Sequence, residues 1–355
     1  MKSNTQKAPR VSIISISYNQ QEYIRDMIEG FLMQQTNFDY EIIIADDCST
    51  DDTGKIIKEY EKKHPHVFNS LHRKKNMGAI PNLMEAMKHA KGEYIALCEG
   101  DDYWTDPQKL QKQVDFMDKN NDYSICFHPV KITFEDSNET SIFPEDVSNL
   151  TLKRLVSANY IQTNSVLYRR QDYSQLKDDV MPGDWYLHLF HAQFGKIGCI
   201  NEAMSVYRRH SRGLWWDARK GPTLLYQKHA QGFLALFAHA YEYYSHDKTL
   251  AKIITSNAIA LVTALLEDKT NNSNNAEEIL QTQPGLVTAV VLSETSENNL
   301  LKVNNQKLEF DNATLKAELG HRDAELQNIK ASKVWKTVES YRRLKPSVRK
   351  KGIIR

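Results

Sequence analysis

The order of short apolar runs in the first part of the chain limits its fold more than any other feature. Runs at residues 11–17 (VSIISIS), 41–45 (EIIIA) and 94–98 (YIALC) are typical of buried strands. Between them lie segments with apolar residues at helical spacing, at residues 24–32, 56–60 and 82–90. Strands that alternate with helices predict an α/β fold, Rossmann-like, with a mostly parallel sheet and helices on both faces.

Polar side chains follow each of these three strands, at the point where the chain leaves the sheet. In chain order they are Tyr18 and Asn19, Asp46 and Asp47, and Asp101 and Asp102. Ligands of open α/β sheets bind outside the carboxyl ends of the strands, so these side chains are expected to meet at one edge. Paired carboxylates at such an edge suit a hard divalent cation that also holds a phosphate.

Each strand end also has a purely structural explanation. Asn19 can cap a helix, and Asp46 with Asp47 can form a turn whose charge favours the N-terminus of the next helix. Two aspartates after a strand are common in turns, because Asp hydrogen-bonds its own backbone there. The coincidence of three such ends favours a shared binding site over three separate turns.

Further elements follow along the chain. The pattern predicts a weaker strand at residues 67–71, a helix at 109–120, strands at 124–128 and 165–168, and an irregular acidic loop at 134–150. Residues 224–266 carry apolar and aromatic side chains at helical spacing. We expect two or three helices there, packed on the preceding domain.

Composition and missing motifs exclude several classes of function. Lys and Arg total 46 against 45 for Asp and Glu, so the net charge of +1 identifies no partner. No GxGxxG motif follows the first strand and no GxxxxGKS motif occurs, so neither dinucleotide nor P-loop chemistry is indicated. The four cysteines have no metal-binding spacing and suit free thiols in a reducing compartment.

The N-terminus and the apolar runs predict a cytoplasmic chain. Residues 1–10 are polar and contain no signal-peptide core. No window reaches the roughly 18 apolar residues that a membrane-spanning helix needs.

Several segments together resemble the inverting family 2 glycosyltransferases of the GT-A fold, of the bacterial surface-polysaccharide type. They are ISISYNQQEYI, EIIIADDCSTDDT, NMG and YIALCEGDDYWTDPQKLQKQVDFM, and the resemblance covers residues 11–210. It implies a nucleotide-sugar donor, with a UDP-sugar as the first expectation, and Mn²⁺ or Mg²⁺ on its diphosphate.

The resemblance also implies roles for individual residues. Tyr18 would stack near the base, Asp47 would accept a hydrogen bond from it, Asp101 would approach the ribose, and Asp102 would ligate the cation. The other donor-binding residues implied by the matching segments are Asn19, Glu22, Asp46 and Asn76. Because this chain has Glu-Gly-Asp-Asp where the family has an Asp-x-Asp motif, Glu99 is a weaker candidate.

A second chemical stretch is MPGDWYLH at residues 181–188. Inverting transfer needs one general base, which takes the proton of the acceptor hydroxyl as its oxygen attacks the anomeric carbon. A carboxylate at a loop-to-helix junction beside an indole suits this task, and the family carries its base here, which implies Asp184. The alternative is a helix N-cap, which Asp favours in any case.

A third stretch, YRRHSRGLWW, spans residues 207–216. His is a common ligand of transition metals, and Arg binds diphosphates through two parallel hydrogen bonds. His210 would therefore complete the metal sphere or touch the diphosphate, and Arg208, Arg209 or Arg212 would offset the charge of the leaving group. The alternative is a basic solvated turn.

The C-terminal part differs in character. Residues 268–283 are rich in Asn, Glu and Gln and resemble a linker, and leucines repeat every seven residues from Leu301, with Asn305 and Asn312 at seam positions. This pattern predicts a short coiled coil that makes a homo-oligomer, the alternative being a monomeric surface helix. The last segment is basic with one apolar face, which predicts docking on the inner membrane surface, the alternative being a disordered tail.

The expected organisation has five parts. They are a disordered N-terminus (1–10), a GT-A catalytic domain (11–216), a helical region and linker (217–295), a coiled coil (296–331) and a basic amphipathic tail (332–355).

The sequence therefore predicts a metal-dependent inverting glycosyltransferase of the hexosyl or N-acetylhexosaminyl class. It would move a sugar from its nucleotide donor to a hydroxyl of a cell-surface glycan or lipid-linked precursor. The alternative is a non-catalytic glycan-binding or scaffold protein on a degenerate GT-A fold. Nucleic acid is not expected as a partner, because no groove motif with interleaved aromatics accompanies the basic tail.

Overall fold

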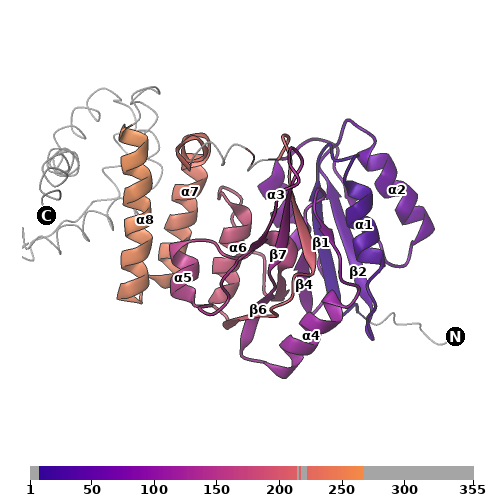
Figure 1. Cartoon of the computed structure of the whole chain (residues 1–355), viewed down its shortest axis with the longest axis horizontal. Helices are drawn as coiled ribbons and strands as arrows, with labels where there is room; N and C mark the ends of the chain where they lie inside the picture. The colour runs from indigo at the N-terminus through magenta and orange to yellow at the C-terminus, as the bar shows by residue number, and fades with distance from the viewer. Residues whose placement is uncertain (1–7, 214–215, 217–221, 268–355) are drawn as a thin grey trace, which may run out of the picture. The chain divides into compact units, whose positions relative to one another are not determined.

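The chain folds around a seven-stranded sheet. The computed structural model describes residues 8–213, 216 and 222–267, all within one compact unit, Met1–Val287 (Figure 1). The strand order is β10-β6-β9-β4-β1-β2-β3. The bounds are β1 (Val11–Ser17), β2 (Tyr40–Asp46), β3 (Leu71–His72), β4 (Tyr94–Leu97), β6 (Tyr123–Phe127), β9 (Leu167–Arg169) and β10 (Lys196–Cys199). Strand β1 is parallel to both of its neighbours, β2 and β4, whereas β9 is antiparallel to β4 and β6.

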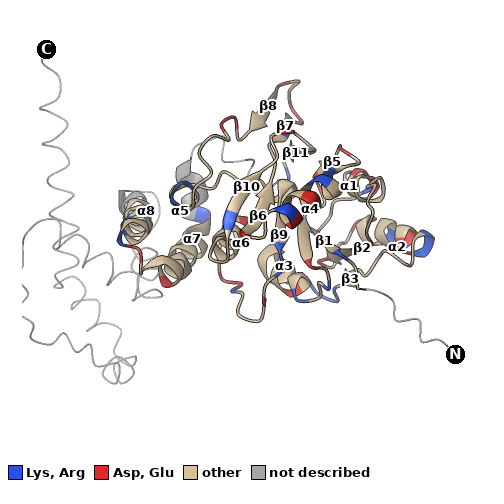
Figure 2. Ribbon diagram, turned by 90° about the horizontal axis from the view of Figure 1, so that it is seen from below, with Lys and Arg blue, Asp and Glu red and all other residues tan. Residues whose placement is uncertain are grey.

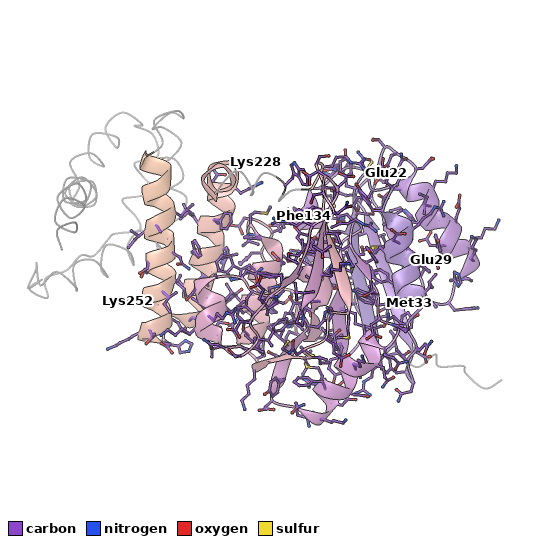
Figure 3. The ribbon with its side chains drawn as sticks, viewed as in Figure 1. Glu22, Glu29, Met33, Phe134, Lys228 and Lys252 are labelled. Carbon is purple, nitrogen blue, oxygen red and sulfur yellow. The ribbon has the colours of Figure 1, made fainter. Side chains whose placement is uncertain are left out.

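Helices cover both faces of this sheet. They are α1 (Ile24–Leu32), α2 (Thr53–Lys63), α3 (Ala79–Met87), α4 (Lys109–Lys119) and α6 (Gly183–Ala192). Val11 and Ile13 of β1 join one apolar cluster with residues of α1, α2 and α4, while the next residue, Ile14, is buried on the opposite face. Figure 1 shows α1 and α2 on one side of the sheet and α3 and α6 on the other, and Figure 3 shows side chains filling the space between. This arrangement explains why the strands are apolar at consecutive positions.

A second, four-stranded sheet runs in the order β5-β11-β7-β8. Its strands are β5 (Tyr103–Trp104), β7 (Val130–Phe134), β8 (Thr140–Phe143) and β11 (Ser205–Arg209). The indole N–H of Trp104 donates to the Asn164 carbonyl at 2.9 Å, within the short 3₁₀ helix η1 (Thr163–Ser165). The Asn164 amide in turn donates to the Val206 carbonyl at 2.8 Å, so η1 holds β5 and β11 together. The second sheet thereby carries β11 to the end of β4.

Three more helices are α5 (Leu152–Ser157), α7 (Pro222–Tyr244) and α8 (Lys248–Glu267). Helices α7 and α8 fall in the range 224–266 where the sequence pattern predicts helices, whereas α5 is not expected from it. The backbone of α7 leaves helical geometry at His229, with φ −126° and ψ 21°. Beyond this kink the Gly232 carbonyl accepts a hydrogen bond from the Met181 N–H at 3.0 Å. The loop that leads into α6 is therefore anchored on α7.

Three expectations differ from the structure. The strand expected at residues 67–71 is reduced to β3 at Leu71–His72, with an isolated bridge between Ile42 and Phe68. The loop expected at 134–150 contains β8, whose largely exposed residues carry no apolar run and pair with β7 instead. Helix α3 begins three residues earlier than expected, because Pro81 is tolerated within the first turn of a helix.

Several other expectations concern the termini. The linker, the coiled coil and the basic tail lie outside the described residues, as does most of the N-terminal segment, so the predicted domain boundaries stay predictions. In the described part of the chain, no helix is both long and apolar enough to span a membrane. Acidic and basic residues are interspersed along the ribbon, in keeping with the small net charge (Figure 2).

The contact between α7 and the loop before α6 leaves no room for a side chain at Gly232. A Cβ there would lie 2.5 Å from the Met181 Cβ and 2.9 Å from its nitrogen. We expect Gly232→Ala to lower the free energy of unfolding by about 1–3 kcal/mol, because the backbone must shift. Urea denaturation measures this, with the exposed neighbour Gln231→Ala as control. Equal stability of the two variants would contradict the close packing.

Candidate active site

A pocket of about 380 Å³ opens at the carboxyl ends of β1, β2 and β4. Its walls come from the residues after β1, the loop before α3, the end of β4 and the segment from β11 onward. Of the residues singled out in the sequence, those that line it are Tyr18, Asn19, Asp47, Asn76, Glu99, Asp101, Arg208, Arg209, His210 and Arg212. The predicted meeting of three strand ends is therefore what the structure shows.

The residues after β1 form one rim of the pocket. Tyr18 is 47% exposed, so its ring is available to a ligand. Asn19 adopts a left-handed backbone conformation with φ 54°, which Asn tolerates better than most residues. Its side-chain oxygen accepts the Thr50 N–H at 2.8 Å, and its own N–H donates to the Ser49 hydroxyl at 3.0 Å. Asn19 thus ties the loop after β2 to the rim rather than capping α1.

The two aspartates after β2 have different surroundings. Asp46 is buried outside the lining, and its carboxylate accepts the Ser49 hydroxyl. Asp47 lines the pocket and accepts the N–H groups of Met77 and Gly78 at 2.7 and 2.9 Å. Asp47 therefore fixes the loop that carries Asn76, whereas Asp46 stabilises the turn before α2.

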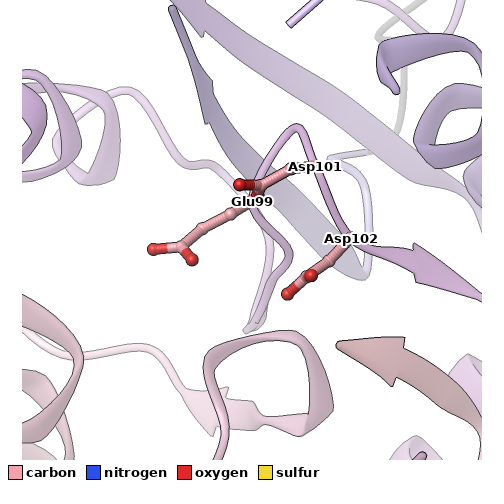
Figure 4. A group of neighbouring side chains, drawn as sticks. All are labelled: Glu99, Asp101 and Asp102. Carbon is pink, nitrogen blue, oxygen red and sulfur yellow. The ribbon is translucent and has the colours of Figure 1, made fainter. Parts of the chain in front are cut away.

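Three carboxylates gather at the end of β4. Glu99, Asp101 and Asp102 each offer an oxygen, and these oxygens all lie within 4.8 Å of one another (Figure 4). One oxygen of Asp102 accepts the Arg208 N–H at 2.9 Å, and the other is buried without a hydrogen-bond partner. We call these three residues the acidic triad.

Burial and mutual repulsion disfavour the ionised form of the carboxyl groups in the acidic triad. Burial, followed by repulsion from Asp101 and Asp184, raises the pKa of Glu99 to about 8. Burial, followed by repulsion from Asp101 and Glu99, raises the pKa of Asp102 well above its usual value. A divalent cation would relieve this repulsion and use the unpartnered Asp102 oxygen, and oxygen ligands are those that Mg²⁺ and Mn²⁺ prefer. The acidic triad therefore fits a divalent cation.

Residues of β11 and the turn after it close over the acidic triad. The Arg208 guanidinium donates to the Asp101 carbonyl at 3.2 Å and pairs with Asp26, and it lies 4.5 Å from the Tyr103 ring centroid. His210 is almost fully buried, and its Nε2 lies 3.0 Å from an Asp101 carboxylate oxygen. His210 thus adjoins the acidic triad through Asp101, one of its members.

Glu22 lies outside the pocket lining. Its carboxylate forms an ion pair with Arg212, which does line the pocket. Both side chains are about half exposed, so this pair contributes little to stability. Glu22 reaches the pocket only by orienting Arg212.

Asp184 lies in the first turn of α6, as the loop-to-helix pattern predicts. Burial raises the pKa of its carboxyl to about 6, against the opposing effect of hydrogen bonds from the Trp185 N–H and the Asn159 amide. The Asn159 Nδ2 donates to Asp184 Oδ2 at 3.0 Å. A carboxyl with this pKa is a suitable proton acceptor near neutral pH. Asp184 is not part of the pocket lining, but it is close enough to raise the pKa of Glu99.

The indole of Trp185 turns out to be structural. Its N–H donates to the Leu155 carbonyl at 2.8 Å, and its ring meets that of Phe237 edge-on. It therefore attaches α6 to α5 and α7.

Sequence reasoning missed several residues of the site. Those that line the pocket without having been singled out are Ile16, Ser17, Gln20, Gly78, Ala79, Asn82, Tyr207, Gly213 and Trp216. Gln20 and Tyr207 lie inside the motifs quoted for the resemblance and the third stretch, so their position was a usable signal. Asn159, which contacts Asp184 from 25 residues away, has no signal in the sequence pattern.

Comparison with known proteins decides the family. The family model described as "Glycosyl transferase family 2" matches residues 12–211, more than half of the chain. The chain belongs to glycosyl transferase family 2.

Two curated relatives and one solved structure show how far this similarity extends. The uncharacterized protein Rv1520 of Mycobacterium tuberculosis is 47% identical over 228 residues, which are 63% of this chain and 66% of that protein. The match thus spans just under two thirds of that relative's length. The putative teichuronic acid biosynthesis glycosyltransferase TuaG of Bacillus subtilis is 29% identical over 62% of this chain and 88% of its own.

The solved structure is TarS of S. aureus, residues 1–349, in complex with UDP-GlcNAc. It superposes with a TM-score of 0.56 at 18% identity and covers 79% of this chain and 81% of its own. At this identity the likeness shows the fold alone. It confirms the expected GT-A fold of this family 2 transferase.

The repulsion within the acidic triad leads us to expect that the stability of the protein depends on pH and on metal. Folded Glu99 binds its proton more tightly than the unfolded chain does, so the free energy of unfolding falls as the pH rises between about 4.5 and about 8. We expect Mn²⁺ to raise the unfolding temperature more at pH 8 than at pH 6, because the cation must displace these protons.

The variant Asp102→Asn tests the same site. Without metal at pH 8 it should unfold at a higher temperature, by about 2–4 °C for each kcal/mol of repulsion removed. It should also lose the shift that Mn²⁺ causes relative to EDTA. Differential scanning calorimetry measures both, with the exposed Asp39→Asn as control. A full Mn²⁺ shift in Asp102→Asn would exclude Asp102 as a ligand.

Proposed function

We propose that this chain is a metal-dependent inverting glycosyltransferase that moves a sugar from a nucleotide-sugar to a hydroxyl of a cell-surface glycan or lipid-linked precursor. The observation that carries this proposal is the acidic triad beside a pocket of about 380 Å³, with Asp184 near it. Pockets of this size suit small-molecule ligands. A cation on the triad would stabilise the departing diphosphate by neutralising charge that develops in the transition state.

The residues after β1 and β2 would bind the nucleoside. The exposed ring of Tyr18 would stack on the base, and the Asp47 carboxylate has lone pairs left after its two backbone hydrogen bonds. Asn76 lines the same side of the pocket. A UDP-sugar is the donor that we propose first, because the structural neighbour TarS binds UDP-GlcNAc.

The residues of the acidic triad and β11 would bind the ribose and the diphosphate. Asp101 would approach the ribose, while Asp102 would ligate the cation through the oxygen that now has no partner. Arg208 and His210 already contact Asp101, so they would offset negative charge at the same place. In this division of roles, two members of the triad and two residues of β11 and the turn after it would each act on the donor or its cation.

Asp184 would act as the general base. Its carboxylate takes the proton of the acceptor hydroxyl while that oxygen forms a bond to the anomeric carbon. The bond from that carbon to the phosphate oxygen breaks with its electron pair, and the nucleoside diphosphate leaves on the opposite face. The configuration at the anomeric carbon is therefore inverted. A pKa of about 6 keeps Asp184 mostly ionised at neutral pH, yet basic enough to accept a proton.

The proposals for the acceptor and the partners come from a relative's name and from the sequence pattern. TuaG carries a name that refers to teichuronic acid biosynthesis, which favours a surface glycan as the acceptor class. The transferred group would be a hexosyl or N-acetylhexosaminyl residue. Docking of the tail on the inner membrane surface and oligomerisation through the C-terminal helix also stay proposals, because both concern residues outside the described part.

Binding of nucleoside diphosphates tests the donor class first. We expect UDP to bind with Mn²⁺ at least about tenfold more tightly than without it, because a cation held by the acidic triad would offset the negative charge of the diphosphate. Isothermal titration calorimetry with UDP, GDP, CDP, ADP and dTDP, each with Mn²⁺ or EDTA, measures this. Preferential binding of another nucleotide would change the donor, and no binding of any would favour the non-catalytic scaffold.

The variant Asp184→Asn tests the base. We expect it to bind UDP and Mn²⁺ as the unmodified protein does but to lose about 10²–10⁴-fold in kcat, the usual contribution of general base catalysis. Asp172→Asn, in a polar exposed loop, is the matched control. Release of UDP from the donor identified by titration gives the rate. Unchanged turnover in Asp184→Asn would exclude it as the base.

A further inference from the structure

We propose that Asn159 is a positioning residue for Asp184, and that His188 holds the segment from which Asn159 reaches it. Asn159 lies in the stretch between α5 and η1, and it has no other role in the reaction described above. The inference rests on the proposed function only in taking Asp184 as the base. The geometry on which it stands is independent of donor and acceptor.

The orientation of the Asn159 amide follows from its two hydrogen bonds. Its Oδ1 accepts the backbone N–H of Ile161 at 3.1 Å. A backbone N–H can only donate, so the oxygen must face Ile161 and the NH₂ group must face Asp184. The Nδ2 lies 3.0 Å from Asp184 Oδ2, within normal hydrogen-bond length. Asn159 is thus fixed at both ends.

His188 fixes the same segment from the other side. It lies on α6 one turn after Asp184, is fully buried, and its Nε2 lies 3.2 Å from the Ile161 carbonyl. Burial lowers the pKa of His188 to about 3, so the ring is neutral. Because a carbonyl only accepts, Nε2 carries the proton and donates it, and Nδ1 accepts the Tyr168 hydroxyl. The hydrogen bond from His188 to Ile161 therefore holds the segment at residues 159–161 against α6.

These hydrogen bonds join helix α6 to the segment at residues 159–161, and we call them the hydrogen-bond circuit. Helix α6 carries Asp184 and His188, His188 binds the carbonyl of Ile161, and the N–H of Ile161 orients Asn159 onto Asp184. The circuit restrains Asp184 about its side-chain torsions and uses Oδ2 for Asn159. A carboxylate offers about four lone-pair sites, so Asp184 can still accept the proton of the acceptor beside these hydrogen bonds. A displacement of about 1 Å at a reacting group can cost about 10² in rate, so such restraint matters.

The circuit also affects the charge of Asp184. A hydrogen bond donated to a carboxylate favours its ionised form. Burial acts against the ionisation of Asp184, while Glu99 at the end of β4 and Tyr168 on β9 face it as neutral groups near pH 6. Asn159, with the Trp185 N–H and the Thr163 hydroxyl, opposes the effect of burial. Loss of Asn159 should therefore raise the pKa of Asp184.

Direct titration of Asp184 tests this inference. The full-length protein, labelled with ¹³C at Asp carboxyls and free of metal, is titrated by NMR, and Asp184→Asn identifies the resonance. We expect Asn159→Ala to raise the pKa of Asp184 by about 0.5–1 unit and Asn159→Asp to raise it further, because a second carboxylate then lies beside it. The matched control is Asn120→Ala, which removes a similar amide-to-carbonyl bond at the end of α4.

Two measurements keep the inference falsifiable. UDP affinity with Mn²⁺ should be unchanged in Asn159→Ala, since Asn159 does not line the pocket, and the unfolding temperature should match that of Asn120→Ala. An Asp184 pKa that stays the same in both Asn159 variants would overturn the inference. If Asp184→Asn keeps full turnover while the pKa shift occurs, the proposed base fails and the positioning contact stands.

Discussion

The repulsion among three closely spaced carboxylates is the constraint on which the site depends. Asp102 is buried and Glu99 and Asp101 are half-buried, so the three cannot all be ionised unless positive charge or N–H groups face them. The structure supplies these groups from β11, through the Arg208 N–H on Asp102 and His210 on Asp101. A second sheet is therefore needed beside the parallel one. It presents β11 to the end of β4, and the residual repulsion is what a divalent cation would remove.

How much the sequence predicts depends on whether an interaction is local. Strands β1, β2 and β4 and their polar ends are local, so the edge where the pocket lies follows from the pattern. The difference between Asp46 and Asp47 does not follow from the pattern, because both lie at the end of β2. Only packing turns Asp46 toward Ser49 and Asp47 toward the loop before α3. Likewise β8 has no apolar run and becomes a strand only by pairing with β7.

The surroundings of Asp184, the proposed base, show the same limit of prediction from sequence. Asp184 at a loop-to-helix junction could be found from the motif around it. Asn159 could not, because a lone Asn between helices is common and only the packing of its segment on α6 brings it to Oδ2. In the sequence, the indole beside Asp184 is a feature that suits a general base, but Trp185 points toward α5 and α7. A residue type can suggest a role that the direction of the side chain in the folded protein then excludes.

Helix α7, which lies beyond the residues that match the family model, contacts residues on either side of Asp184. The match ends at residue 211, whereas the Gly232 carbonyl of α7 holds Met181, and Phe237 of the same helix packs on Trp185. These contacts flank Asp184 on both sides in the sequence. The pocket at the strand ends lies within the α/β part, whereas the orientation of α6 depends on α7. In the proposed reaction, donor binding and base positioning would therefore be separable, and changes in α7 are expected to act on transfer without altering the pocket.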